Sequence, residues 1–151
     1  MANLFNSNLA EIKISYMNNV KPSDRRKVSG SADMADILRN VWSDRIEYVE
    51  EFLVICLNRA NMVLGWAKVS QGGISGTVAD PKVIFQVALK ANASSIIIAH
   101  NHPSGNLQPS EADINLTRKI KDAGLSLDLP VLDHLILTPE GYYSFADEGL
   151  I

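Results

Sequence analysis

The chain has 151 residues, of which 46% are hydrophobic and 21% are charged, a length and composition that suit one globular domain with a buried core. Its 14 Lys and Arg residues and 17 Asp and Glu residues give a formal net charge of -3, which does not favour a broad nucleic-acid-binding surface. A single cysteine, Cys56, excludes an internal disulfide and a cysteine-based zinc knuckle.

The first 40 residues are polar and predict accessory structure. "IKISYM" alternates apolar and polar residues and predicts an edge strand, "KPSDRRKVSG" predicts a linker, and apolar residues spaced at helical intervals from Ser31 predict the start of a helix with Ser31 as N-cap. The opening "MANLFNSNLAEIK" has no signal-peptide segment, and no apolar run approaches membrane-spanning length. We therefore expect a cytoplasmic protein without a membrane partner, with residues 1–40 accessory and residues 41–151 forming the functional domain.

The next segments predict a hairpin and a helix. "EFLVICLN" and "MVLGWAKVS" are apolar and separated by "NRAN", as in an antiparallel hairpin. The glycine-rich "QGGISGT" lacks the Lys-Ser/Thr ending and the spacing of a phosphate-binding loop, so we interpret it as a connection. Asp80 and Pro81 suit the N-cap and first turn of a helix whose apolar face contains Ile84, Val87, Ala88 and Ala91.

The second half predicts a central strand, a helix and two further strands. "SSIIIA" is a continuous apolar run, typical of a strand covered on both faces. After the loop "HNHPSGNLQP", a helix is predicted from about Ser110 to Ala123, ended by Gly124, with Leu116, Ile120 and Ala123 on its apolar face. "LPVLDHLILT" and "YYSFA" are strands joined by "PEG". The fold class is therefore α/β, a three-layer single domain with a mixed β-sheet.

Two histidines at the end of the "SSIIIA" strand indicate a metal site. His100 and His102 are two residues apart, so on an extended chain their imidazoles point to the same side. Zinc sites for hydrolysis take three protein ligands and keep one position for water. Asp113, in the first turn of the next helix, is the candidate third ligand, because Pro103, Gly105 and Pro109 mark the intervening segment as a loop that folds back.

A purely structural interpretation is also available for each of these residues. Ser110 and Asp113 fit the S-x-x-D capping pattern, so Asp113 could only cap its helix. The two histidines could be ordinary polar residues at a strand end. Asp133 and His134 in "LDHLIL" could orient a metal ligand, or could be a buried polar pair on a strand. Asn101 points away from its histidine neighbours and is interpreted as structural.

The longer pattern resembles a known family. His100-x-His102, then Ser110, then Asp113 matches the H-x-H-x7-S-x2-D signature of the JAB/JAMM metalloproteases, and "AHNHPSGNLQPSEAD" with "LDHLIL" and "SFADEGLI" resembles the RadC branch. The resemblance implies a cytidine-deaminase-like three-layer fold and Zn²⁺ held by His100, His102 and Asp113. It also implies catalytic roles for Ser110 beside the metal and for an upstream glutamate in an E-x-F context.

"VEEFLV" offers two glutamates for that role. Glu50 has the E-x-F spacing relative to Phe52, whereas Glu51 is adjacent to it. Alternation along a strand sends the two side chains to opposite sides, so only one can face the metal. We predict Glu50, and the alternative for either glutamate is a charged residue at a strand start.

The resemblance implies a zinc-dependent peptidase or amide hydrolase that uses an activated water and a glutamate base. Its expected partner is an unidentified peptide or protein substrate, and a homodimer is compatible with the family. Two alternatives stay open: a non-catalytic JAB interaction module, and an accessory protein of DNA repair or mobile elements. The net charge and the lack of a helix-hairpin-helix-like region in residues 1–40 give nucleic-acid binding no direct support.

Overall fold

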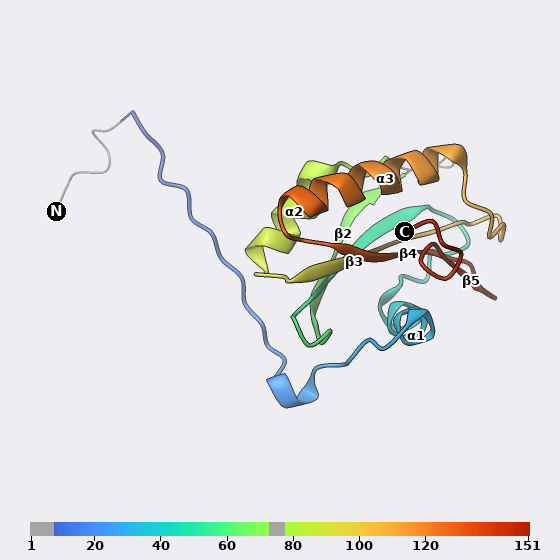
Figure 1. Cartoon of the computed structure of the whole chain (residues 1–151), viewed down its shortest axis with the longest axis horizontal. Coiled ribbons are helices and arrows are strands. Elements are labelled where there is room, and N and C mark those ends of the chain that lie inside the picture. The colour runs from blue at the N-terminus through green and yellow to red at the C-terminus, as the bar shows by residue number, and fades with distance from the viewer. Residues whose placement is uncertain (1–7, 73–77) are drawn as a thin grey trace.

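The computed structural model describes residues 8–72 and 78–151, in which a five-stranded mixed sheet lies between helices (Figure 1). The strand order is β2-β1-β3-β4-β5, with β3 and β4 parallel and the other neighbours antiparallel. The strands are β1 (Glu51–Leu57), β2 (Val63–Gln71), β3 (Ser95–Asn101), β4 (Val131–Leu137) and β5 (Tyr142–Ser144). The predicted hairpin, central strand and mixed sheet are confirmed.

Helices cover both faces of this sheet. Figure 1 shows α2 (Pro81–Lys90) and α3 (Glu111–Ser126) on one face and α1 (Ser31–Val41) on the other. A short 3-10 helix (Pro22–Asp24) precedes α1. The predicted three-layer α/β architecture is therefore confirmed. Among the described residues, no helix is long and apolar enough to cross a bilayer.

The central strands β1 and β3 are buried on both faces. Every residue of both strands is buried. In β1, Phe52, Val54 and Cys56 pack into the core beneath α2 and α3, and Leu53, Ile55 and Leu57 pack into the core beneath α1. Side chains of successive residues thus enter opposite layers. A polar residue at a strand end therefore faces the same layer as the residues two and four positions away from it, which is what we call its parity.

The helices α2 and α3, which cover one face of the sheet, begin with side-chain caps. The Asp80 carboxylate accepts a hydrogen bond from the backbone N–H of Lys82 at 2.9 Å, as its predicted N-cap role requires, and Pro81 occupies the first turn. Ser110 is the N-cap of α3. Ser31 is instead the first residue of α1, and Gly30 precedes it as the N-cap residue.

Gly124 does not end α3, contrary to the prediction. The helix continues to Ser126, and the chain then folds back so that the Leu129 N–H donates to the Gly124 carbonyl at 2.8 Å. A Cβ at residue 124 would lie 2.3 Å from the Leu129 carbonyl oxygen. The glycine is therefore required by the close approach of the returning backbone rather than by a helix end.

The predicted N-terminal edge strand is wrong. Residues 12–17 form no strand, and the Ile12 and Ile14 side chains are 87% and 77% exposed. The segment is held to the sheet edge through side chains, since Tyr16 and Asn18 both donate to the Leu64 carbonyl. A boundary between residues 40 and 41 falls within α1, whose buried face is part of the core. Most of the glycine-rich segment "QGGISGT" lies outside the described residues.

Candidate metal centre

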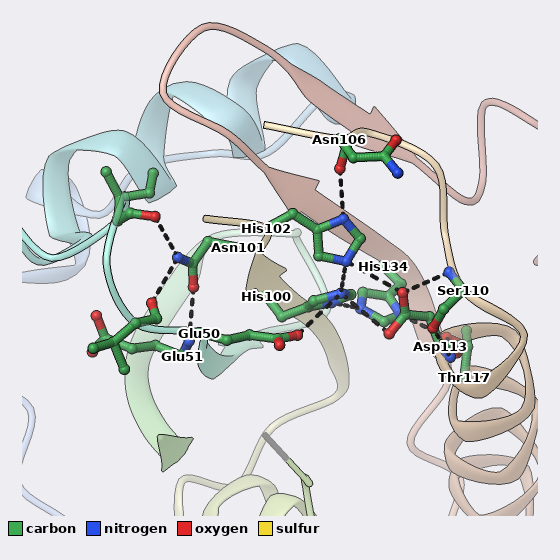
Figure 2. Close-up of polar contacts among 12 residues, drawn as sticks. Glu50, Glu51, His100, Asn101, His102, Asn106, Ser110, Asp113, Thr117 and His134 are labelled. Atoms are coloured by element: carbon green, nitrogen blue, oxygen red, sulfur yellow. Dashed lines mark hydrogen bonds and ion pairs between the residues drawn. The ribbon is translucent and has the colours of Figure 1, made fainter. Parts of the chain in front are cut away.

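All three histidines of the chain meet at one end of the sheet, on the face covered by α3 (Figure 2). His100 is the penultimate residue of β3 and shares its parity with Ile98, which packs into the core beneath α3. His134 lies beside it on β4, paired in register with Ile98. His102 follows the end of β3, where its N–H donates to the Leu137 carbonyl of β4.

Four residues bring ligand-type atoms together in front of these strands. The Nε2 atoms of His100 and His102 are 3.0 Å apart. The Asp113 carboxylate spans both, with Oδ1 3.3 Å from His100 Nε2 and Oδ2 3.3 Å from His102 Nε2. Glu50 Oε1 lies 3.8 Å from His100 Nε2. One ligand atom from each of the four residues lies within 4.8 Å of every other, so they can share one cation.

Asp113 is brought to the histidines by the capped start of α3. The Ser110 hydroxyl accepts from the Asp113 N–H at 3.0 Å, and the Ser110 N–H donates to Asp113 Oδ2 at 2.8 Å. This is a complete capping box, so the capping interpretation is confirmed. Asp113 Oδ1 still points at His100, so the same side chain caps the helix and faces the site.

The electrostatics of the site are those of a cation-binding cluster. Partial burial would raise the pKa of Asp113, but its contacts with the imidazoles of His100 and His102 outweigh this and hold that pKa far below its usual range. The pKa of His102 is raised, chiefly by its contact with the Asp113 carboxylate. With a metal bound, His100 and His102 would be neutral ligands, and the carboxylates of Glu50 and Asp113 would supply two negative charges to balance a divalent cation.

Backbone and side-chain acceptors orient both candidate histidine ligands. His102 Nδ1 lies 2.6 Å from the Asn106 carbonyl oxygen, which can only accept, so Nδ1 carries the proton and Nε2 keeps its lone pair. His100 Nδ1 lies 2.7 Å from Nε2 of His134. Burial of His134, and the nearby His100, hold the pKa of His134 well below its usual value. Asn106 was not predicted from the sequence, whereas orienting a metal ligand was one of the two interpretations left open for Asp133 and His134.

Aromatic rings fix the planes of the two buried imidazoles. Phe52 stacks on His100 with ring centroids 5.8 Å apart and planes 3° apart. Phe145 stacks on His134 at 4.5 Å and 13°. His100 and His134 are 1% and 0% exposed, so neither ring has room to rotate away from the site.

Glu50 and Glu51 enter different layers, as alternation predicts. Glu50 faces the histidines and belongs to the four-residue cluster. Glu51 is buried on the opposite side, where its carboxylate accepts from Lys68 at 2.8 Å and from the Ser43 hydroxyl. Only Glu50 has access to the candidate metal centre.

Two neighbouring polar residues have structural roles. The Asn101 side chain is fully buried, accepts from the Glu51 N–H at 2.7 Å and donates to the carbonyls of Ile46 and Val49, which supports its structural interpretation. Asp133 accepts from the His134 N–H, the Ala146 N–H and the Ser144 hydroxyl. Of the pair Asp133 and His134, only His134 points to the site, and Asp133 has a structural role.

The residues present fit a tetrahedral zinc ion. Zinc–nitrogen and zinc–oxygen bonds of about 2.0–2.1 Å place tetrahedral ligands about 3.3 Å apart. The two Nε2 atoms of His100 and His102 are 3.0 Å apart, and each lies 3.3 Å from one of the two Asp113 oxygens, Oδ1 for His100 and Oδ2 for His102. Two lone pairs held 3.0 Å apart on the Nε2 atoms of His100 and His102 would repel, so a cation or a proton shared between them would stabilise this arrangement. The Glu50 oxygen, at 3.8 Å, lies slightly farther out.

The chain matches one protein family over most of its length. The RadC-like JAB domain family matches residues 28–150, which include the whole candidate site. A UPF0758 protein of Flavobacterium johnsoniae is 45% identical over 125 residues, which are 83% of this chain and 54% of that protein. A UPF0758 protein of Salinibacter ruber is 40% identical over 128 residues, which are 85% of this chain and 54% of that protein.

The chain spans about half the length of these relatives. The match begins at residue 28 and so contains α1 as well as the sheet. A family match over residues 28–150, with the H-x-H-x7-S-x2-D residues gathered at one site, carries the conclusion. The chain belongs to the RadC-like JAB domain family.

Proposed function

We propose that the protein is a zinc-dependent hydrolase of amide bonds, acting on a peptide or isopeptide substrate. The observation that carries this proposal is the convergence of two imidazoles, one bridging carboxylate and a fourth, more distant carboxylate around one point. Hydrolytic zinc sites combine three protein ligands with an open position and a nearby base. His100, His102 and Asp113 supply the first part and Glu50 the second.

Zinc is the metal that this donor set suits best. Two imidazole nitrogens and a carboxylate are borderline ligands that zinc accepts readily, and no thiolate lies in the cluster. When bound, zinc would supply Lewis acidity and lower the pKa of a coordinated water from about 15.7 to about 7. The chain's own residues must then move the proton and orient the substrate.

The position of Glu50 supports a role as the general base. Its side chain is 19% exposed, so it is in contact with solvent while pointing into the site. Its distance of 3.8 Å from His100 Nε2 exceeds the spacing within the ligand triad. Glu50 would accept a proton from the attacking water and deliver it to the leaving amine.

Ser110 has a hydroxyl hydrogen that its capping role does not use. As N-cap, its oxygen accepts from the Asp113 N–H at 3.0 Å, so its hydrogen remains available for donation. Ser110 is exposed and adjoins the Asp113 side of the site. It would donate to the oxyanion that develops on the scissile carbonyl, an interaction worth roughly 3 kcal/mol in comparable sites.

The proposal is tested by metal analysis and substrate profiling of the full chain. Purified protein should contain about one zinc per chain, and H102A should lose it. The zinc-loaded protein should cleave members of a library containing peptide and lysine isopeptide bonds, with ¹⁸O from labelled water in the new carboxyl group. If H102A keeps its zinc, the metal site is not the one proposed. If E50Q still cleaves the substrate, Glu50 is not the base.

A further inference from the structure

We infer that Thr117 and His134 form a positioning chain that holds His100 in the one tautomer able to bind a metal. The chain runs from His100 through His134 and Thr117 to the backbone carbonyl of Asp113 (Figure 2). Both of its ends are residues of the candidate metal centre. This inference rests on the proposed metal site and adds the residues that prepare its ligands.

The Asp113 end of the positioning chain decides which group donates in each of its hydrogen bonds. Thr117 Oγ1 lies 2.6 Å from the Asp113 carbonyl oxygen, and a carbonyl can only accept. The single hydroxyl hydrogen must therefore point to Asp113, since two oxygens this close without a hydrogen between them would repel. Back-bonding of a threonine to the carbonyl four residues earlier is common in helices, but here it leaves the hydroxyl with only a lone pair to offer elsewhere.

That lone pair faces His134. Thr117 Oγ1 lies 2.5 Å from His134 Nδ1, so Nδ1 must carry a hydrogen and donate it. His134 is 0% exposed, and no carboxylate of residues 8–72 or 78–151 is hydrogen-bonded to it. A buried cation without a hydrogen-bonded counter-charge is strongly unfavourable. His134 is therefore the neutral Nδ1–H tautomer, with an Nε2 lone pair.

The same logic fixes His100. Its Nδ1 lies 2.7 Å from the Nε2 lone pair of His134, so Nδ1 carries a hydrogen and Nε2 is left as an acceptor. This Nε2 is the atom that faces His102 and Asp113. The opposite polarity would place a hydrogen on His100 Nε2 and block a metal ligand. Metal-binding histidines usually donate their second N–H to a carboxylate or carbonyl; here a neutral histidine, itself set by a threonine, accepts it.

The imidazole rings of His100 and His134 cannot rotate to exchange their hydrogen-bond partners. The stacking of Phe52 on His100 and of Phe145 on His134 holds both ring planes. The remaining freedom is the choice of tautomer, and the Thr117 hydroxyl makes that choice. Thr117 is 2% exposed and has no path to substrate, so it is a positioning residue that acts through His134.

The decisive experiment compares T117V, which removes the hydroxyl at nearly constant size, with T117S, which restores it. Thr138, another buried threonine, whose hydroxyl contacts Gly141, supplies the control T138V. Zinc affinity is measured by competition with a chelator, and imidazole tautomers are read from long-range ¹H–¹⁵N spectra of the metal-free protein. We expect T117V to lower zinc affinity by about 10-fold or more and to move the hydrogen of His134 to Nε2. T117S and T138V should stay close to wild type.

The contrary results separate the positioning chain from the proposed function. Wild-type His134 with its hydrogen on Nε2 would overturn the inference without any variant, including the case in which T117V fails to fold. Equal zinc affinity in T117V and wild type, or equal losses in T117V and T138V, would also overturn it. A wild-type chain that binds no zinc would instead overturn the proposed function, and the tautomer spectra would still decide whether the positioning chain exists.

Discussion

Glu50 and Glu51 are consecutive in the sequence but face opposite sides of the sheet. Glu50 Oε1 lies 3.8 Å from the Nε2 atom of His100, whereas Glu51 Oε2 lies 2.8 Å from the Lys68 ammonium. The difference follows from strand alternation: Glu51 has the parity of Leu53, beneath α1, and Glu50 has the parity of Phe52, beneath α3. Two residues of identical chemistry therefore form a matched pair for testing the site.

E50Q should keep zinc and lose turnover. The amide preserves the size of the side chain but cannot accept the proton of the attacking water, so kcat should fall by about 10²- to 10⁴-fold. Zinc content is measured by mass spectrometry and kcat on the substrate found by profiling. E51Q, which changes the same group on the other face, should retain most of the wild-type kcat. Greater inactivation by E51Q than by E50Q would show that Glu51, and not Glu50, is the base.

E51Q should instead alter the pH dependence of stability. Burial would raise the pKa of Glu51, but the hydrogen bonds from Lys68 and Ser43 outweigh it and hold that pKa below its usual value. A carboxyl group with a depressed folded-state pKa contributes stability above its unfolded-state pKa of about 4.3, and this is lost as the pH falls through the folded-state pKa.

The free energy of unfolding, measured in urea from pH 7 down to pH 3, should therefore fall less steeply in E51Q than in wild type below about pH 4.3. At pH 7 the variant should be less stable, because Lys68 loses its ionic partner. Parallel curves for the two proteins would show that Glu51 is not held ionised by these contacts.

Much of this arrangement was open to prediction from the sequence. The His100, His102 and Asp113 cluster follows from strand parity and from a loop that folds back, and the structure brings all three together with Glu50. Thr117 could have been found too, since it lies four residues after Asp113 and so on the same helix face. The positioning role of His134 was undecidable, because it depends on the register between β3 and β4, which only the tertiary structure fixes.

The errors have physical causes as well. The period-two pattern of residues 12–17 indicates a strand only if a sheet edge pairs with its backbone. In the described part of the chain these residues form no strand, and Tyr16 and Asn18 reach the Leu64 carbonyl through their side chains. Gly124 has the residue type of a helix end, but its reason is a backbone contact with Leu129, five residues later. In both cases the contacts of the folded chain, which the residue pattern does not contain, decide the outcome.

Removing the metal should destabilise the whole domain. The candidate ligands come from β3, from the residue after it and from α3, so a cation that joins them would stabilise the folded state alone. Free zinc at 1,000 times its Kd should add roughly 4 kcal/mol to the free energy of unfolding. Differential scanning fluorimetry with zinc and with a chelator measures the shift. D113N, which removes a ligand charge, should abolish it, and an unchanged shift in D113N would place the stabilising ion elsewhere.

Cys56 should be unreactive in the folded protein. The side chain is 1% exposed in the middle of β1, and burial raises the pKa of its thiol to about 11. The thiolate is the reactive form, so little of it exists at neutral pH. A disulfide reagent such as DTNB should label less than a few per cent of the chains under native conditions and one thiol per chain in denaturant. Rapid native labelling would contradict the two-sided burial of β1.

Ser110 caps α3 and is also proposed to donate to the oxyanion, and two substitutions distinguish these roles. At an N-cap, replacement by alanine costs about 1 kcal/mol of stability, whereas replacement by glycine costs only a few tenths. Both remove the hydroxyl that would donate to the oxyanion, and loss of one such donor lowers kcat by about 10²- to 10³-fold. S110A and S110G should therefore differ in their free energies of unfolding but share the same loss of kcat, while S110T should retain both properties. A kcat that follows stability across the three variants would mean that Ser110 acts only by capping α3 and thereby placing Asp113, because the Asp113 N–H and carboxylate both depend on that cap.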